Sequence, residues 1–276
     1  MEAERLTANG THTSSVDLLG LRFAPWTEQQ VVDEVFGALT GRSGLPHGGW
    51  IVTPNVDVLR QIARSTDVRN LVTHADMFLA DGMPLIWASR VQGTPLPERV
   101  TGAALLPRLS ERAATEHRRV FLLGGAEGVA AAGVTALRER HPDIAADGWS
   151  PPFGVEATPE GMAEIRARVS AAAPDLVFCS FGFPKQERVI CALRDLLPNA
   201  WFVGCGAALD FAAGKVSRAP DWMQRSGLEW VHRLWKEPRR LFRRYIIDDI
   251  PFALELLYCA FRQRWSDRRA ARKGQH

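Results

Sequence analysis

The sequence predicts an α/β fold: a Rossmann-like parallel sheet with helices on both faces, plus a basic helical C-terminal appendage. Three observations predict it. Short apolar segments end in glycine or a polar residue, helical segments of about 10–15 residues separate them, and this alternation stops near residue 216. Basic and aromatic residues dominate from there on. We therefore expect two domains, residues 1–216 and residues 217–276.

The composition is that of a folded, globular chain. Of its 276 residues, 46% are hydrophobic and 24% are charged, which argues against wholesale disorder. This length allows one substantial core and an appendage. The four cysteines show no C-x-x-C spacing, so we expect reduced thiols in a cytosolic protein. The polar N-terminus lacks an apolar signal core, and no apolar run approaches the roughly 18 residues that span a bilayer.

The first half of the chain begins the alternation. A short strand or hairpin is expected at residues 16–23, and Thr27 is placed to cap the helix that follows. In order, the other expected elements are a helix at 28–39, a loop at 41–49, a strand at 50–55 that breaks at Pro54, a helix at 56–66, a strand at 77–82 and a helix around 84–91.

The second half repeats the alternation more clearly, and Thr158 is placed to cap one of its helices. In order, we expect a strand at 119–125, a helix at 129–140, a loop at 151–154, a helix at 159–172, a strand at 175–182, a helix at 185–196 and a strand at 200–206.

The C-terminal segment breaks this rhythm. Pro220 can begin a helix that continues to about Lys236, and Pro238 fits the first turn of a second helix. We expect that second helix to run past Tyr245 until Pro251 kinks or breaks it. The segment has 14 Lys and Arg residues against 7 Asp and Glu, a net charge of about +7, whereas the chain before it carries about −4. Such a segment favours an anionic partner: ligand phosphates, nucleic acid or an acidic membrane surface.

Residues that follow the strands are the candidate ligand contacts, because open parallel sheets bind ligands at the carboxyl ends of their strands. Asp81 follows an apolar strand, where partial desolvation would make its carboxylate a better proton acceptor. An equally good interpretation is that Asp81 caps the next helix. Gly124 and Gly125 could cradle a phosphate with backbone N–H groups, although close helix–strand packing explains such a pair as well. The full set is Thr53, Asn55, Asp81, Gly82, Gly124, Gly125, Gly182, Lys185, Gln186, Glu187, Gly204, Gly206 and Asp210.

Missing motifs argue against several classes of protein. The chain has no H-E-x-x-H, no clustered His and Cys and no D-x-D, so we expect neither a metal site nor a cofactor. Ser180 lies in C-S-F-G rather than G-x-S-x-G, which disfavours a hydrolase nucleophile. The absence of a strict G-x-G-x-x-G lowers the odds of a nicotinamide dehydrogenase.

Seven blocks in one order resemble the WecG/TagA/CpsF family of bacterial glycosyltransferases, and the resemblance covers about Val16 to Tyr245. The blocks are T-P-N at 53–55, A-D-G at 80–82, E-R-V-T-G at 98–102, F-L-L-G-G at 121–125, F-G-F-P-K-Q-E at 181–187, G-C-G-A-A-L-D-F-A-A-G at 204–214 and R-A-P-D-W-M-Q-R-S-G-L-E-W-V-H-R-L-W-K-E-P-R-R-L at 218–241.

The resemblance implies a metal-independent, inverting glycosyltransferase. It would move a sugar, typically N-acetylmannosamine or its uronic acid, from a UDP-sugar to a polyprenyl-diphosphate-linked sugar on the cytoplasmic leaflet. By the same likeness, Asp81 would be the catalytic base. Substrate binding is implied for Thr53, Asn55, Arg99 and Gln186, and closure over the diphosphate for Arg233, Arg240 and Arg243. We also predict that Arg218, Gly124 and Gly125 bind substrate.

Arginine chemistry suits this assignment. Inversion needs a base for the acceptor hydroxyl and a cation to stabilise the departing UDP, and guanidinium forks fit phosphate. Arg239 and Arg244 fit a solvated face equally well. The chain departs from the family pattern at Phe183, Ala104, Ala207 and Leu209, and Ala104, which replaces an acid, could change which sugar the pocket accepts.

The tail and the resemblance together predict a peripheral enzyme on the inner face of the plasma membrane. Residues 217–276 would hold it on anionic lipid and complete the active site, in the synthesis of a cell-surface or teichoic-acid-like wall polymer. Two alternatives are a nucleic-acid-binding α/β protein and a Rossmann-type oxidoreductase; we expect no nucleic-acid partner. The sequence does not identify the sugar, the acceptor glycan or the linkage, and it is compatible with a homo-oligomer.

Overall fold

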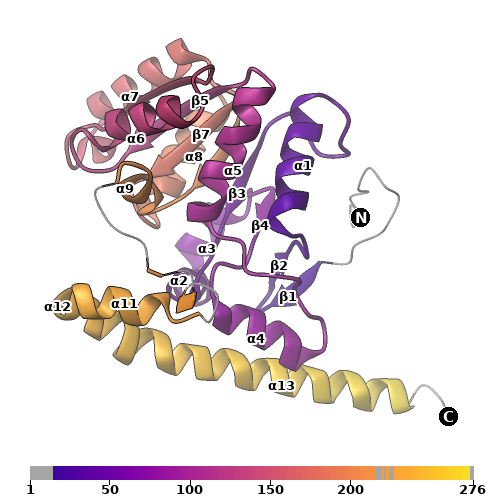
Figure 1. Cartoon of the computed structure of the whole chain (residues 1–276). Coiled ribbons are helices and arrows are strands. Elements are labelled where there is room, and N and C mark those ends of the chain that lie inside the picture. Colours follow the sequence, from indigo (N-terminus) through magenta and orange to yellow (C-terminus); the bar gives the residue numbers. More distant parts are fainter. Residues whose placement is uncertain (1–14, 215–218, 221, 224–226, 274–276) are drawn as a thin grey trace.

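A computed structural model describes residues 15–214, 219–220, 222–223 and 227–273. Its centre is a six-stranded sheet in the order β4-β3-β8-β7-β5-β6, with every neighbouring pair parallel (Figure 1). The predicted α/β fold is therefore confirmed. The strands are β3 (Gly49–Val52), β4 (Met77–Phe78), β5 (Arg119–Gly124), β6 (Ala145–Trp149), β7 (Leu176–Ser180) and β8 (Trp201–Gly204).

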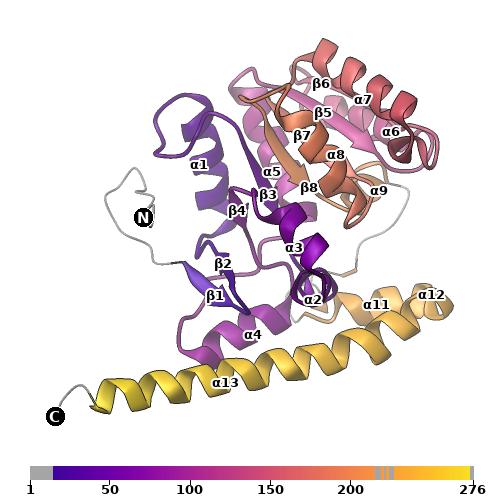
Figure 2. The same cartoon turned by 180° about the vertical axis from the view of Figure 1, so that it is seen from behind.

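Alternate residues of the central strands face two separate cores, as the two-residue period of a strand requires. Trp50 and Val52 lie in one core, while Ile51 between them lies in the other. Helices on the first face are α2 (Val56–Arg64), α4 (Met83–Gln92), α7 (Pro159–Ala172) and α8 (Lys185–Arg194). Helices on the second face are α1 (Glu28–Leu39), α5 (Gly102–Thr115), α6 (Val129–Arg140) and α9 (Ala208–Ala212). Figure 2 shows the molecule from behind.

Caps define several helix starts, as the sequence predicts. The Thr27 hydroxyl accepts a hydrogen bond from the Gln30 N–H, and the Gln30 side chain accepts one from the Thr27 N–H. Thr158 caps α7 through a single bond, in which its hydroxyl accepts from the Gly161 N–H. The expected helix at 56–66 is two elements, because Ser65 ends α2 and caps the short α3 (Thr66–Val72). The predicted hairpin is present as β1 (Val16–Leu18) and β2 (Leu21–Phe23).

The C-terminal helices run along one end of the sheet layer (Figures 1 and 2). They are α11 (Glu229–Lys236), α12 (Pro238–Phe242), the π-helical segment η2 (Arg243–Asp249) and α13 (Ile250–Lys273). α13 packs on α4 through Phe252, Leu256 and Ala260, which belong to the first core. No helix in the part of the chain that the structure covers has the length and apolarity needed to cross a bilayer.

Two expectations for this region are wrong. A continuous helix from Pro220 to Lys236 does not form, because Gly227 has φ +77° and α11 begins only at Glu229. Pro251 does not end the second helix. It falls in the first turn of α13, directly after η2, where the Ile250 N–H already donates to the Tyr245 carbonyl five residues back. That wider turn accommodates a residue without an N–H.

Candidate active site

A pocket of about 410 Å³ opens between the sheet layer and the C-terminal helices. Its polar side contains Asp81 and Asn55, which follow β4 and β3, together with Arg99 from the loop before α5. Glu229 and Arg233 of α11 complete this side. The structure thus brings four of the residues predicted from sequence, Asn55, Asp81, Arg99 and Arg233, to one place.

Asp81 lies at the pocket because its backbone continues the edge of the sheet. Its N–H donates to the Pro54 carbonyl at 2.9 Å, which joins the ends of β3 and β4. The residue at the start of α4 is Gly82, with no side-chain capping bond, so Asp81 does not cap that helix. The Asp81 carboxylate lies 3.8 Å from the Arg99 guanidinium and is 28% exposed, so it can meet a ligand in the pocket.

An alternating series of charges crosses the pocket from the body to α11. Arg99 lies between Asp81 and Glu229, and its Nη1 is 3.4 Å from the Glu229 carboxylate. Glu229 also accepts a 2.7 Å bond from Arg233 Nη2. Sequence reasoning missed Glu229, although its spacing of four residues from Arg233 on a helix signals this pair. Glu229 holds a body arginine and an appendage arginine next to each other.

Arg233 reaches the body of the protein as well. Its guanidinium lies 5.3 Å from the ring centroid of Phe211 in α9. Burial acts to lower the pKa of Arg233, but Glu229, Tyr245 and Asp81 together outweigh burial, and the pKa is raised. The arginine is therefore a permanent cation at the point where α11 meets the sheet.

The two predicted residues after β3 differ in position. Asn55 caps α2, since its Oδ1 accepts a bond from the Val58 N–H at 3.0 Å, and it lines the pocket. Thr53 is half-buried and is not among the residues that line the pocket. Its predicted substrate contact stays a prediction.

Gln186 lies under the neighbouring strand ends rather than in the pocket. Its Oε1 accepts a bond from the Gly206 N–H at 3.2 Å, and its Nε2 donates to Glu187 at 3.0 Å. Glu187 is fully buried, and burial raises the pKa of its carboxyl to about 7, although the Gln186 bond acts in the opposite direction. Gln186 thus fixes the loop after β8, and its role with substrate stays a prediction.

Gly124 and Gly125 form a tight connection between strand ends. A Cβ at Gly124 would lie 2.5 Å from the Ser180 carbonyl oxygen, and the Gly125 N–H donates to that same oxygen at 2.8 Å. Close packing therefore explains both glycines. Neither lines the pocket, and the phosphate contact stays a prediction.

The arginines of the tail divide into three groups. Arg233 and Arg244 line the pocket, whereas Arg243 is exposed and does not. The π-helical segment η2 inserts part of a turn here, which changes the face on which the successive arginines lie. Arg218 and the side chain of Arg240 lie outside the described residues.

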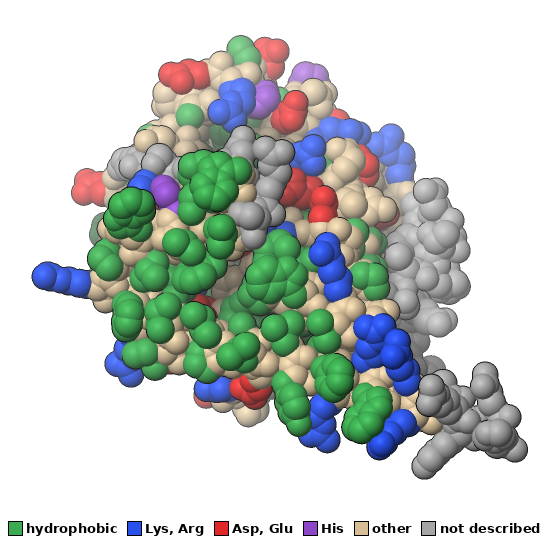
Figure 3. All heavy atoms as spheres, turned by 60° about the horizontal axis from the view of Figure 1, so that its bottom comes forward, with side chains coloured by type: hydrophobic (Ala, Val, Ile, Leu, Met, Phe, Trp, Pro, Cys, Tyr) green, Lys and Arg blue, Asp and Glu red, His purple; other side chains and the backbone are tan. Residues whose placement is uncertain are grey.

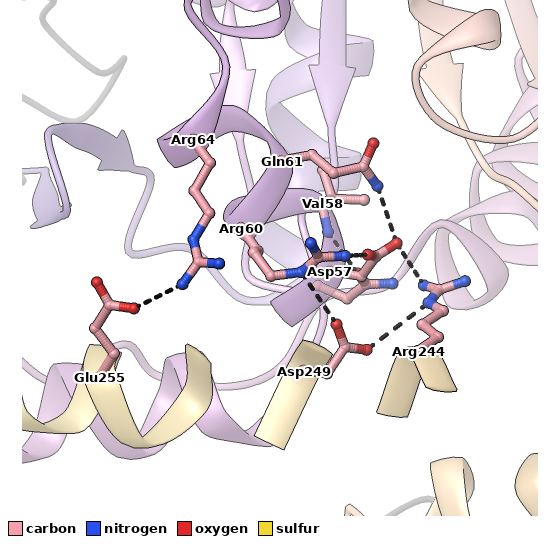
Figure 4. A network of polar contacts seen from close by, with 9 residues as sticks. Asp57, Val58, Arg60, Gln61, Arg64, Arg244, Asp249 and Glu255 are labelled. Atoms are coloured by element: carbon pink, nitrogen blue, oxygen red, sulfur yellow. Dashed lines mark hydrogen bonds and ion pairs between the residues drawn. The ribbon is translucent and has the colours of Figure 1, made fainter. Parts of the chain in front are cut away.

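A second set of charges fastens η2 to α2 beside the pocket (Figure 4). Asp57 accepts a 2.6 Å bond from Arg60 and pairs with Arg244 at 3.1 Å. Asp249 lies 3.7 Å from both arginines. Because two acids meet two arginines from different parts of the chain, this network fixes the place of the appendage on the body.

Burial raises the pKa of Asp249 from 3.8 to about 6; Asp57 adds to the rise, and Arg244 and Arg60 oppose it. The folded state thus binds this proton more tightly than the unfolded chain, so the stability from this group is lost as pH rises from about 4 to about 6. We expect the melting temperature of wild type to fall over this range relative to that of Asp249→Asn. Glu255→Gln removes an exposed carboxylate of α13 that pairs with Arg64 of α2, and this variant should follow wild type. If the melting temperatures of wild type and Asp249→Asn change in parallel with pH, the prediction is contradicted.

The outer side of the pocket is apolar. Hydrophobic side chains gather around a hollow on the face made by the C-terminal helices, with Lys and Arg side chains near its margin (Figure 3). Within the described part of the chain, no three His, Cys, Asp or Glu side chains are grouped so that they could hold a metal ion. The arrangement offers a carboxylate, several guanidinium groups and an apolar wall to one ligand.

Comparison with known proteins gives one consistent result. Residues 16–269 match the family described as "Glycosyl transferase WecG/TagA/CpsF family". A relative from Bacillus spizizenii is 32% identical over 193 residues, which is 70% of this chain and 73% of the relative. A relative from Bacillus subtilis is 28% identical over 79% of each chain, and one from Staphylococcus aureus is 29% identical over 84% of this chain and 89% of its own length. All three are named N-acetylglucosaminyldiphosphoundecaprenol N-acetyl-beta-D-mannosaminyltransferase.

Proposed function

The chain belongs to the WecG/TagA/CpsF family of glycosyl transferases, and on that premise we propose what it transfers and how. The donor is a UDP-sugar, with N-acetylmannosamine or a related hexose or uronic acid as the sugar. The acceptor is a sugar linked to polyprenyl diphosphate. The names of the relatives support this acceptor and this sugar. Ala104, which replaces an acid of the family pattern, is half-buried in the first turn of α5 and is where donor choice would differ.

One observation carries the proposal: Asp81 and the guanidinium groups of Arg99 and Arg233 line a single pocket at the carboxyl ends of β3 and β4. Inverting transfer needs this pair of functions. A base must take the proton of the attacking hydroxyl, and cations must stabilise the negative charge that develops on the leaving group. Arg233 comes from α11, so the site is complete only with the C-terminal helices in place.

The reaction that we propose is a direct displacement. Asp81 accepts the proton of the acceptor hydroxyl while that oxygen attacks the anomeric carbon on the face opposite UDP. The bond from the anomeric carbon to the UDP oxygen breaks, and the electron pair stays on the β-phosphate. Arg99 and Arg233 neutralise that charge, and the configuration at the anomeric carbon inverts. Bidentate guanidinium groups suit this role without a divalent ion.

The screen that tests this function measures UDP release from a panel of UDP-sugars with a prenyl-diphosphate-linked N-acetylglucosamine. We expect turnover with UDP-N-acetylmannosamine or a related sugar only when the acceptor is present. No release with any donor and acceptor pair would contradict the proposed function.

We further propose that the protein works on the anionic inner face of the membrane, with its C-terminal helices against the lipid. Leu254, Tyr258, Phe261 and Trp265, here called the apolar stripe, recur every three or four residues on α13, and each is more than half exposed. Arg262 and Arg269 lie over the Tyr258 and Trp265 rings, so positive charge accompanies the apolar stripe and would be attracted to anionic lipid. The double substitution Phe261→Ser with Trp265→Ser should lower the affinity for anionic vesicles by about tenfold or more. Phe153→Ser, a change at a 97% exposed site after the opposite edge strand β6, should leave the affinity unchanged.

A further inference from the structure

The pocket has two chemically distinct sides, and the proposed reaction uses only one. Asp81, Arg99 and Arg233 form the polar side. The opposite side, here called the prenyl wall, consists of Met83 and Trp87 from α4 and Leu254 and Leu257 from α13. No step of sugar transfer needs these apolar side chains.

Packing accounts for only part of the prenyl wall: Met83 and Leu257 pack against the first core, whereas Trp87 and Leu254 belong to neither core. α13 packs on α4 through Phe252, Leu256 and Ala260, whose side chains are at most 3% exposed. Trp87 and Leu254, by contrast, line the pocket and are 44% and 63% exposed. Large apolar side chains that stay exposed beside a pocket are typical of a ligand-binding surface.

The prenyl wall is continuous with the apolar stripe. Leu254 belongs to both, and Tyr258, Phe261 and Trp265 continue the same face of α13 away from the pocket. One pocket therefore combines a carboxylate, guanidinium groups and the prenyl wall, and the apolar stripe leads away from it along α13. A sugar joined through a diphosphate to an isoprenoid chain has polar, anionic and apolar parts that match these surfaces.

We propose that the prenyl wall binds the first isoprenyl units of the acceptor, those next to the diphosphate. This inference rests on the proposed function, since it assigns part of that acceptor to part of that pocket. Arg244 also lines the pocket and is 36% exposed, so it supplies positive charge for the acceptor diphosphate, while Arg99 and Arg233 serve the departing UDP. A volume of about 410 Å³ is near the lower end for ligand pockets, so only the proximal units fit, and the rest of the chain stays in the membrane.

The test uses the full-length protein in solution, without vesicles, and acceptors that differ only in their apolar group. N-acetylglucosaminyl diphosphates would carry a methyl, a geranyl or a farnesyl group. We expect kcat/KM of wild type to rise by about tenfold or more from methyl to geranyl or farnesyl, because each buried methylene contributes to binding. Equal kcat/KM for all three acceptors would overturn the proposal.

Two pairs of substitutions compare the part of this apolar surface that lines the pocket, which includes Leu254, with the part of the apolar stripe that lies outside the pocket. Trp87→Ser with Leu254→Ser should remove the preference for geranyl and farnesyl, so that the three acceptors react with similar kcat/KM. Both residues are exposed, so the melting temperature should also be unchanged. Phe261→Ser with Trp265→Ser, outside the pocket, should keep the preference and lose only vesicle binding.

The outcomes that contradict the inference differ from those that contradict the proposed function. An equal loss of kcat/KM with all three acceptors in the prenyl-wall variant would show that the prenyl wall does not bind the isoprenyl units. Dissociation of an oligomer in that variant, with the chain preference intact, would assign the wall to a second copy of the protein. Absence of turnover by wild type with every acceptor would overturn the proposed function and the inference with it.

Discussion

Asp81→Asn is expected to lower turnover by about 10²–10⁴-fold while the affinity for UDP stays close to that of wild type. The amide has the shape of the carboxylate but does not accept the proton of the acceptor hydroxyl, and removal of a general base costs a factor of this size. Asp81 is partly exposed in the pocket and does not cap α4, so the change should not unfold the protein. Initial rates of UDP release and a UDP binding titration measure the two quantities.

The matched control for this prediction is Asp67→Asn. Asp67 is an exposed acid in the first turn of α3 and does not line the pocket. Its variant should turn over like wild type. If Asp81→Asn keeps turnover within a factor of about ten of wild type, Asp81 is not the base.

Arg233→Ala is expected to lower kcat/KM by about 10²–10³-fold, the cost of removing one group that stabilises charge in a transition state. Arg233→Lys should lie between the alanine variant and wild type, because a lysine keeps the charge but not the planar pair of donors. In the alanine variant, Glu229 loses its bond to Arg233 and keeps its contact with Arg99. The change should therefore affect kcat as well as KM.

Arg239→Ala is the control, since Arg239 is an exposed residue of α12 on the same appendage. A similar loss in both variants would show that the total charge of the tail, rather than the position of Arg233, governs the rate. Equal activity of Arg233→Ala and wild type would remove α11 from the mechanism.

The sheet could be predicted because its strands are apolar runs that end in glycine or a polar residue. β6 escaped prediction because its sequence A-A-D-G-W contains an acid and a glycine, and it is an edge strand with alternate exposed residues. α5 escaped prediction because it begins at Gly102, a weak helix former, and has Pro107 in its interior, where proline is unusual. In each case burial against neighbouring elements outweighs the local preference of the residues.

The site could be predicted in part for a similar reason. Asn55 and Asp81 follow neighbouring parallel strands, and such strand ends meet at one edge of a sheet. Arg244 lies in the pocket and Arg243 outside it because of the π-helical segment η2. No residue pattern in the sequence predicts this segment. Glu229 is one of several acids in the tail, and only its contacts with Arg99 and Arg233 distinguish it.

The central claim is that guanidinium groups supplied across the pocket, and not a divalent ion, neutralise the charge on the departing UDP. The most direct measurement is the rate of UDP release by wild type and Arg233→Ala in excess EDTA, repeated after Mg²⁺ or Mn²⁺ is added back. The claim predicts that wild type keeps its full rate in EDTA, and that added metal does not restore the alanine variant. A wild-type rate that collapses in EDTA and returns with the metal would contradict it.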